Sequence, residues 1–320
     1  MGRKATSVLI AFFKKWKYRI YEPIRLKYER FTHRHEKDDK YGFTQNFYNF
    51  LGIKSNPLIS IITPTYNRAE LLIERAIKSV QNQTYRNYEH IIVSDGSTDN
   101  TKELVESIKD NRIKFFEVKR KTPHHNYNKM KGWFIGGINA ANFALSKVKG
   151  KWIARIDDDD FWTKDHLKKL VEFAQFYDFE FVSSPYAIIK DGIQEKFPPV
   201  YFKSPYFYPK RKGIDINSPL IGGHSCWLYR SYLKFMKYNP QVWRKSWNKV
   251  DDTDLSLRMY EAGVGIGFLD EILAHLIPRP GETEVGSKAV KEKIQKEKKT
   301  NFYLNSYLNY MKFFNEENEE

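Results

Sequence analysis

The sequence predicts an α/β fold: a mostly parallel central sheet flanked by helices, with helical extensions at both ends of the chain. Short apolar runs rich in β-branched residues alternate with amphipathic segments, a pattern typical of parallel strands joined by crossover helices. The 320 residues, 41% of them hydrophobic, suffice for one large domain with appended ends. The single cysteine, Cys226, excludes a disulfide framework and a cysteine metal cluster.

The first half of the domain repeats a strand, a polar loop and a helix. We predict strands at residues 58–63, 90–94 and 113–118, and helices at residues 69–82, 102–109 and 136–147. Asn67 is expected to cap the first of these helices. Each strand then ends in a loop at the same edge of the sheet, where open α/β sheets bind their ligands.

The second half continues the pattern with more irregular connections. We predict strands at residues 152–156, 179–183, 221–229 and 264–269, and helices at residues 164–177 and 251–262. Asp191-Gly192 is a hairpin signal, a glycine turn leads into the strand at 221–229, and Gly263 is a natural helix stop.

The two ends differ in composition from the domain, which we place at residues 56–285. Residues 1–55 form a basic, partly amphipathic extension, in which 12 Lys or Arg outnumber 5 Asp or Glu over the first 40 residues. Pro23 is expected to interrupt its first helix. Residues 286–320 are predicted to form a helical extension with an acidic tail.

The first twenty residues alternate lysines with apolar residues at helical spacing: Leu9, Phe12, Phe13, Trp16 and Ile20. Such a helix suits an anionic membrane surface, although a helix packed on the protein's own body shows the same pattern. The longest early apolar run, residues 8–13, is far shorter than the roughly 20 residues of a membrane span. We therefore expect a cytoplasmic protein, with peripheral contact at an anionic membrane left open.

Four consecutive acids, Asp157 to Asp160, follow the strand predicted at residues 152–156. Adjacent carboxylates repel one another, and a hard divalent cation such as Mg²⁺ or Mn²⁺ relieves the repulsion because it prefers oxygen ligands. The run therefore predicts a metal site at the carboxyl end of a strand. The alternative is a solvated acidic turn that only caps the next helix.

Further polar residues follow other predicted elements. Asp95 ends the strand at 90–94, where it could accept from a base imide or a ribose hydroxyl, or could cap the next helix. Asp252 lies with Asp251 at a helix N-terminus, so it is either a general base or a cap. His275 and Arg279 could reach a metal-bound diphosphate.

Four motifs in this order resemble those of the large inverting family 2 glycosyltransferases, which have a GT-A fold. They are Ile61 to Arg68, Ile92 to Asp99, Ile156 to Asp160 and Val250 to Leu255. The resemblance covers roughly residues 57–280. Each motif alone is a weak signal, and the four at these spacings are a strong one.

The resemblance implies a role for each matching residue. It implies donor contacts at five positions: Thr63, Tyr66, Asp95, Asn142 and, near the ribose, Asp158. It implies metal contacts at Asp157 and Asp159, with Asp159 the more direct ligand, and more loosely at His275. Asp252 would be the catalytic base.

Three positions depart from the family pattern. Ser94 replaces the first of two acids before a glycine, Ala141 stands where many members have an arginine, and Asp251 replaces a glutamate. The second departure removes a cation from the donor site. The candidates to replace that cation are Lys129, Lys131 and Arg155.

We therefore expect a metal-assisted glycosyltransferase. It would move a sugar, with inversion, from a nucleotide-sugar donor to a hydroxyl of a glycan or lipid-linked acceptor, in polysaccharide or glycan synthesis. UDP is the favoured carrier because Asp95 suits a uracil imide. A divalent cation, Mn²⁺ or Mg²⁺, would neutralise the departing diphosphate while Asp252 takes the acceptor proton.

Three alternatives stay open at this point. Two acid clusters could hold two metals, which would suit a phosphoryl transferase or hydrolase. The basic ends could bind nucleic acid, but the sequence has no helix-turn-helix, zinc-finger or RNA-binding signature, so no nucleic-acid partner is expected. The third alternative is a catalytically silent adaptor at the membrane.

Overall fold

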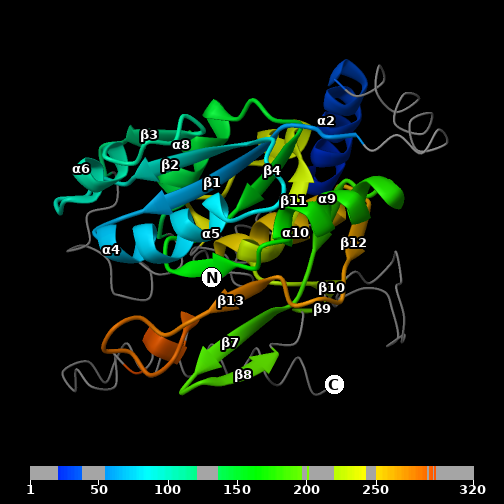
Figure 1. The fold of residues 1–320 in the computed structure, drawn as a ribbon. Coiled ribbons are helices and arrows are strands. Elements are labelled where there is room, and N and C mark those ends of the chain that lie inside the picture. The colour runs from blue at the N-terminus through cyan, green and yellow to red at the C-terminus, as the bar shows by residue number, and fades with distance from the viewer. Residues whose placement is uncertain are drawn as a thin grey trace, which may run out of the picture.

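The structure is a computed structural model that describes residues 21–37, 55–120, 136–196, 200–201, 220–242, 250–286, 288–290 and 292. Its centre is a seven-stranded sheet in the order β12-β6-β11-β4-β1-β2-β3, with helices on both faces (Figure 1). β11 runs antiparallel to both of its neighbours, and the other pairings are parallel. The predicted α/β fold with a mostly parallel sheet is confirmed.

The strands are short, and most lie close to their predicted positions. Those of the central sheet are β1 (Ile59–Thr65), β2 (Tyr88–Ser94), β3 (Ile113–Glu117), β4 (Trp152–Arg155), β6 (Phe181–Ser183), β11 (Trp227–Arg230) and β12 (Ile266–Phe268). A second sheet contains β5 (Asp160–Trp162), β13 (Ala274–Leu276), β7 (Tyr186–Lys190) and β8 (Ile193–Lys196). A two-stranded ladder joins β9 (Val200–Tyr201) to β10 (Leu220–Ile221).

Helical segments connect these strands. Where one helix is predicted at residues 69–82, three joined segments lie: α4 (Ala69–Leu71), the π-helical η2 (Leu72–Ile77) and α5 (Lys78–Gln81). The other α-helices are α2 (Glu22–Lys37), α6 (Thr101–Glu106), α8 (Ile138–Lys147), α9 (His166–Phe176) and α10 (Asp251–Glu261). Two 3₁₀ segments are η4 (His224–Cys226) and η5 (Ser231–Met236).

Side chains of the central strands divide between two hydrophobic clusters, one on each face of the sheet. Ile61 shares a cluster with Leu72 and Leu167, so this face is covered by η2 and α9. Its neighbour Ile62 lies in the other cluster with Ala141 and Leu255, under α8 and α10. Because both faces are covered, the parallel strands read as continuous apolar runs rather than as alternating patterns.

The parallel strands β1, β2 and β4 end at one edge of the sheet, and this edge receives the predicted site residues. Thr65 pairs with Ser94 across the ends of β1 and β2. Asp95 follows β2 directly, and Asp157 comes two residues after Arg155, the last residue of β4. The acids that the sequence singled out therefore gather where the strands end.

The second sheet places β13 beside the end of the acid run. β5 pairs antiparallel with β13, so that Phe161 lies opposite His275. β7 and β8 form the predicted hairpin, with Asp191 and Gly192 in the left-handed region at φ +51° and +76°. Both residues of the turn have positive φ, as the Asp-Gly pair predicts.

The strand predicted at residues 221–229 is interrupted. β10 ends at Ile221, the turn η4 follows, and β11 begins at Trp227. A Cβ atom at Gly222 would lie 1.8 Å from the carbonyl oxygen of Ser184, so glycine allows a close approach of two backbones here. The predicted glycine turn is present, but the strand after it begins only at Trp227, because η4 lies between them.

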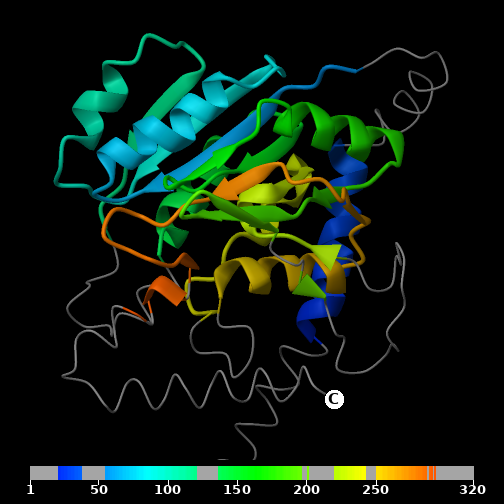
Figure 2. The same ribbon diagram turned by 60° about the horizontal axis from the view of Figure 1, so that its bottom comes forward.

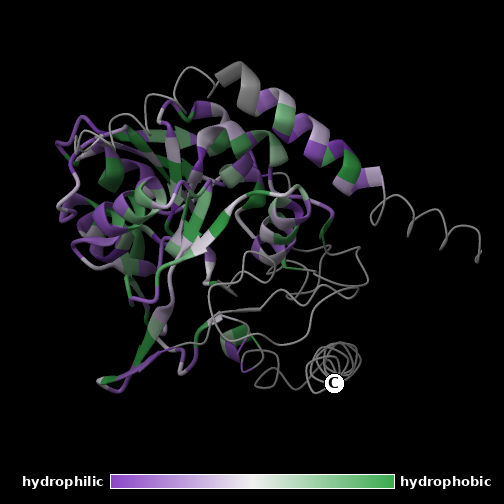
Figure 3. Cartoon of the chain, turned by 90° about the vertical axis from the view of Figure 1, so that its right-hand side faces the viewer, coloured by the Kyte–Doolittle hydropathy of each residue, from purple (hydrophilic) through white to green (hydrophobic). Residues whose placement is uncertain are grey.

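The helix α2 docks the amino-terminal extension onto the domain. Pro23 lies in its first turn, where proline is tolerated. Leu26 is 1% exposed, and Arg30 forms an ion pair with Glu180. The helix lies beside α10 (Figure 2) and at the edge of the molecule, where hydrophilic and hydrophobic residues mix along it (Figure 3).

The remainder of the predicted extensions lies outside the described residues. This applies to residues 1–20, with their predicted amphipathic helix, to residues 38–54 and to most of residues 286–320. Lys129 and Lys131, two of the predicted replacement cations, also lie outside the described residues. Among the helices that the structure describes, none has the length and apolar character of a membrane span.

Candidate active site

The acid run forms a turn between β4 and β5. The backbone N–H of Asp160 donates to the carbonyl oxygen of Asp157 at 3.2 Å. One carboxylate oxygen from each of Asp157, Asp159 and Asp160 lies within 4.8 Å of the others. This set of three oxygen donors fits a hard divalent cation such as Mg²⁺ or Mn²⁺.

Asp158 and Asp159 face two arginines. Arg68 Nη1 is 2.7 Å from Asp158 Oδ1 and 3.8 Å from Asp159 Oδ2. Arg279 Nε is 2.5 Å from Asp159 Oδ2, and Thr65 Oγ1 donates to Asp158 Oδ2 at 2.9 Å. These contacts offset the repulsion between neighbouring acids and keep the carboxylates together.

Asp158 is the most enclosed acid of the run, with 3% of its surface exposed. Burial raises the pKa of its carboxyl to about 6 although Arg68 opposes the shift, and the charge of Asp159 adds to the rise. Thr65 and Arg68 already contact its two oxygens. The contact of Asp158 with a ribose stays a prediction.

His224 joins the acid run to the second acidic motif. Its Nε2 is 2.6 Å from Asp157 Oδ2, and its Nδ1 is 3.4 Å from Asp252 Oδ2. Arg155 Nε donates to Asp157 Oδ1 at 3.1 Å. Burial acts to raise the pKa of Asp157, but His224 and Arg155 hold it below its ordinary value. One imidazole ring thus separates Asp157 from Asp252.

Asp251 and Asp252 begin α10, but their surroundings differ. The Asp251 side chain is 8% exposed and lies 3.6 Å from Arg155 Nη1, and burial raises its pKa to about 6 against the effect of that arginine. The Asp252 side chain is 24% exposed. Burial opposes its ionisation, but hydrogen bonding to His224 lowers the Asp252 pKa. Asp252 is therefore the more accessible member of the pair and has the lower pKa, so its carboxylate is ionised and reachable, as a general base must be.

The turn η4 carries two site residues that the sequence did not single out. Besides His224, Ser225 Oγ donates to Asp160 Oδ2 at 2.6 Å and accepts from the N–H of Asp157 at 3.2 Å. Burial raises the pKa of Asp160 well above its ordinary value, and the neighbouring acids add to the shift. The sequence signal for this turn is the glycine pair before it, which marks a close approach without naming the partner.

Two predicted donor contacts lie at the ends of β1 and β2. Thr63 is fully buried, and its Oγ1 is 2.9 Å from His90 Nε2 inside the sheet. Asp95 is 3% exposed and accepts from Asn139 Nδ2 at 3.3 Å. Thr65, two residues beyond Thr63, is the β1 residue that contacts the acid run. The roles of Thr63 and Asp95 stay predictions.

Tyr66 and Asn142 have different surroundings. The guanidinium carbon of Arg120 lies 3.3 Å from the ring centroid of Tyr66, on the loop after β1. Asn142 is committed within the protein: its Nδ2 donates to the Tyr238 carbonyl oxygen at 2.9 Å, and its Oδ1 accepts from the Tyr238 N–H at 2.8 Å. Their contacts with a donor stay predictions.

His275 lies outside the group of three carboxylates. Its imidazole stacks on Phe161, with ring centroids 4.8 Å apart. Burial lowers its pKa, which favours the neutral form that a metal ligand needs. Four residues further on, Arg279 makes the contact with Asp159. The metal contact of His275 stays a prediction.

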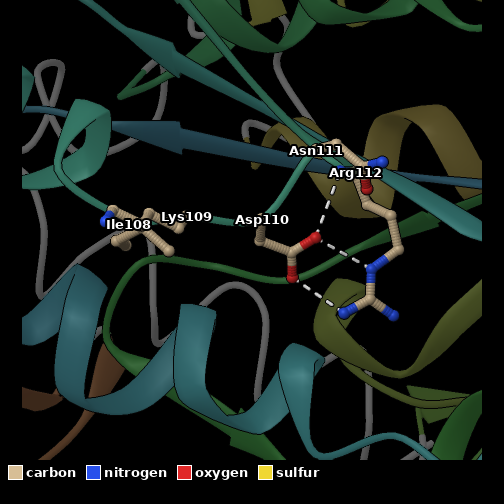
Figure 4. A pocket seen from close by; sticks show the side chains of 5 residues that line it. All are labelled: Ile108, Lys109, Asp110, Asn111 and Arg112. Atoms are coloured by element: carbon tan, nitrogen blue, oxygen red, sulfur yellow. Dashed lines mark hydrogen bonds and ion pairs between the residues drawn. The ribbon is translucent and has the colours of Figure 1, made fainter.

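A depression at the opposite edge of the sheet does not include these acids. It is lined by Ile108, Lys109, Asp110, Asn111 and Arg112 (Figure 4). These residues precede β3, at the amino-terminal edge of the sheet. Asp110 accepts from Arg112 Nε at 2.9 Å and from Nη2 at 2.7 Å, so its charge is matched locally. We therefore place the candidate active site at the carboxyl-terminal edge.

The fold is similar to that of S. aureus TarS. One crystal structure of TarS aligns with 73% of this chain and 38% of its own, at a TM-score of 0.52 and 20% identity. A structure of TarS 1-349 in complex with UDP-GlcNAc aligns with 70% of this chain and 60% of its own, at a TM-score of 0.50 and 21% identity. The fold of this chain is therefore of the GT-A type, as predicted.

The comparison of sequences gives the family. The family model described as Glycosyl transferase family 2 matches residues 60–235, which is more than half of the 320 residues. The chain belongs to glycosyl transferase family 2, and the resemblance drawn from its four motifs is confirmed.

Curated relatives match part of the same region. WcaA of Escherichia coli strain K12, whose name assigns it to colanic acid biosynthesis, is 37% identical over 163 residues, or 48% of this chain and 52% of its own. WfaP of Escherichia coli, named as a UDP-Glc:alpha-D-GlcNAc-diphosphoundecaprenol beta-1,3-glucosyltransferase, is 36% identical over 136 residues, or 42% of this chain and 49% of its own. The chain spans about half the length of these two relatives.

Proposed function

We propose that this protein transfers a sugar, with inversion and metal assistance, from a nucleotide-sugar donor to an acceptor hydroxyl. The observation that carries the proposal is the meeting of two acidic motifs at one edge of the sheet. Three carboxylate oxygens of the acid run lie within 4.8 Å of one another, and Asp252 faces Asp157 across His224. Membership of the family supports the same reaction.

The donor end of the site is built from acids and arginines. Asp157 and Asp159 would hold the divalent cation, Mn²⁺ or Mg²⁺, with His275 as a further candidate. When bound, that cation supplies positive charge to a departing diphosphate. Arg279 and Arg68, already beside the acid run, add fixed positive charge on the same side.

Asp252 acts as the general base. Its lowered pKa keeps the carboxylate ionised at neutral pH, so it accepts the proton of an acceptor hydroxyl as that oxygen attacks the anomeric carbon. His224 contacts its Oδ2, and the Thr253 N–H donates to its Oδ1 at 2.6 Å. These contacts orient the carboxylate. One displacement inverts the anomeric centre, and the proton ends on Asp252.

The donor is proposed to be a UDP-sugar. Asp95 offers a carboxylate at the end of β2 that would accept from the imide of uracil. Thr63, Tyr66, Asn142 and Asp158 are the other proposed donor contacts. The relative WfaP is named for a UDP-Glc donor and a diphosphoundecaprenol-linked acceptor, which supports UDP and a glycan or lipid-linked acceptor for this chain.

The proposed location is the cytoplasm, with peripheral contact to an anionic membrane through residues 1–20. The basic and apolar residues of that segment support the proposal. Deleting residues 1–20 should move the protein from the membrane fraction to the soluble fraction. An unchanged distribution would count against membrane contact.

The test of the function is a thermal-shift screen of nucleotide sugars with and without MnCl₂ or MgCl₂. We expect a UDP-sugar to raise the melting temperature only with metal, and a transfer assay with that donor to release UDP. Release of phosphate from a nucleotide without sugar transfer would assign a phosphoryl transferase or hydrolase instead. No shift with any nucleotide sugar would overturn the proposal.

A further inference from the structure

The side chain of Arg75 joins three backbone carbonyls from two distant segments. Its Nη1 donates to the carbonyl oxygens of Asp159 and Ile277, both at 2.8 Å. Its Nη2 donates to the carbonyl oxygen of Pro278 at 3.0 Å. The side chain is half-buried, so water reaches these hydrogen bonds only in part.

These three hydrogen bonds need the geometry of a guanidinium. Its nitrogens form a planar, rigid fork whose N–H groups point in fixed directions. A lysine offers one compact ammonium on a flexible stem, which cannot reproduce three contacts spread over two nitrogens. Lysine at position 75 therefore keeps the charge and loses the link.

Arg75 projects from a π-helical turn. The turn η2 interrupts the helical segment that begins with α4, and Leu72, Ala76 and Ile77 within it are buried. π-helical turns are rare in proteins, and those that occur often lie at functional sites. The buried residues on either side of Arg75 hold the turn against the core, which fixes the point from which the guanidinium reaches out.

Both segments that Arg75 joins carry a charged group of the candidate active site. Asp159 supplies one oxygen of the three-carboxylate group, and Arg279 follows Pro278 directly. Arg279 Nε is 2.5 Å from Asp159 Oδ2, and Arg279 Nη1 is 3.6 Å from Glu282 Oε1. Arg75 therefore fixes the backbone on each side of the Asp159–Arg279 pair.

We propose that Arg75 is a positioning residue for the donor end of the active site. It holds Asp159 and Arg279 at a fixed separation, so that the carboxylate is placed for a cation while the guanidinium is placed for a nucleoside diphosphate. The inference rests on the proposed function. Loosening the link weakens donor binding more than it slows proton transfer at Asp252.

The test compares Arg75→Lys with Arg86→Lys. Arg86 is a matched control because it also donates to a backbone carbonyl, that of Gln81 at 2.9 Å, but on the exposed surface. For Arg75→Lys we expect the Kd of UDP with MnCl₂, measured by calorimetry, to rise about 10- to 100-fold, as supporting residues at metal sites show. The donor KM should rise in parallel while the acceptor KM stays unchanged. Arg86→Lys should match wild type in all three.

A double-mutant cycle with Arg279→Gln tests whether Arg75 acts through Arg279. In that background Arg75→Lys should weaken binding of UDP with MnCl₂ much less, because the group that Arg75 positions is gone. An equal effect in both backgrounds would overturn the proposal.

The outcomes separate this inference from the function beneath it. Wild-type affinity in Arg75→Lys would overturn the positioning role and leave the proposed function standing. Failure of the wild-type protein to bind UDP or a UDP-sugar with metal would overturn both.

If Arg75→Lys lowers the melting temperature, hydrogen exchange of the unliganded protein shows whether the loss of stability is local or extends across the fold. We expect faster exchange at residues 157–160 and 277–286, with wild-type protection in β1 and β2. Equal loss of protection across the central sheet would overturn the positioning role.

Discussion

Acidic residues at the two edges of the central sheet have different surroundings. At the amino-terminal edge, Glu89 accepts from Ser60 Oγ at 2.6 Å and also from Lys114. Asp110 is held there by Arg112, which donates from Nε at 2.9 Å and from Nη2 at 2.7 Å. That hydrogen bonding holds the pKa of Asp110 well below its usual range. These acids are matched by neighbours and serve the fold.

The carboxyl-terminal edge leaves capacity for a ligand. In the described part of the chain, two buried atoms near Asp252 lack a hydrogen-bond partner: Arg155 Nη1 and Asp251 Oδ2, which are 3.6 Å apart. Buried polar atoms without partners are uncommon and call for an explanation. Here they lie between two acidic motifs. Binding and chemistry are therefore expected at the carboxyl-terminal edge, called the open edge below, rather than at the amino-terminal edge, called the closed edge.

The largest expected effect is that of Asp252→Asn at the open edge. The amide has the same shape and cannot take the acceptor proton, so kcat should fall by about 10²- to 10⁴-fold. Binding of UDP with MnCl₂, measured by calorimetry, should stay at the wild-type level. Undiminished turnover would remove Asp252 from the chemistry.

Asp159→Ala should act on binding instead. Losing one of three carboxylate oxygens should lower transfer activity by about 100-fold or more, and the metal-dependent thermal shift with UDP should disappear. Removing metal from the wild-type protein with a chelator should give the same loss. Adding MnCl₂ should restore the activity of the chelated wild-type protein but not that of Asp159→Ala. A metal-dependent shift that survives in Asp159→Ala would contradict the assigned role.

Asp110→Ala is the matched change at the closed edge. Removing the carboxylate leaves Arg112 without its partner and should lower the free energy of unfolding by about 1.5–3 kcal/mol. Denaturant unfolding measures this loss, while kcat and the donor KM should stay at wild-type values. A drop in activity of the folded variant would show that the two edges are coupled.

The last expected effect is a pH dependence of stability from two buried histidines outside the acid run. Burial lowers the pKa of His90 and His166 to about 3 each. The unfolded chain gains these protons near pH 6.5 and the folded chain does not, so each histidine lowers stability as pH drops below about 6.5, by up to about 1.4 kcal/mol per pH unit. Asp158 and Asp251, whose pKa is raised to about 6, act in the opposite direction over the same range. Denaturant unfolding between about pH 7 and pH 5 should show a shallower slope for His166→Gln. An unchanged slope would contradict this account.

The sequence predicted the features that depend on local pattern. An apolar run that ends in acids predicts a buried strand and the position of its carboxyl end. This pattern placed Asp95 and Asp157 correctly at strand ends. The start of α10 at Asp251 and its stop at Gly263, with φ +75°, follow from the same local rules.

The direct partners of these acids could not be predicted, although Arg279 was expected near the same site, because they come from far along the chain. His224 lies 67 residues from Asp157, and Arg279 lies 120 residues from Asp159. Both contacts depend on elements that only the folded chain brings together: the turn η4 for His224, and the pairing of β5 with β13 for Arg279. Asn142 shows the converse, since a side chain placed in the donor site by motif alone is bonded to the Tyr238 backbone.

Gly222 illustrates how little room the site leaves. Even one methyl group at this position would overlap the oxygen of Ser184, so every other amino acid forces the two backbone segments apart. The displaced segment leads into η4, which carries the His224 that contacts Asp157 and Asp252. We therefore expect replacement of Gly222 to displace His224 from Asp157 and Asp252 and so to lower activity.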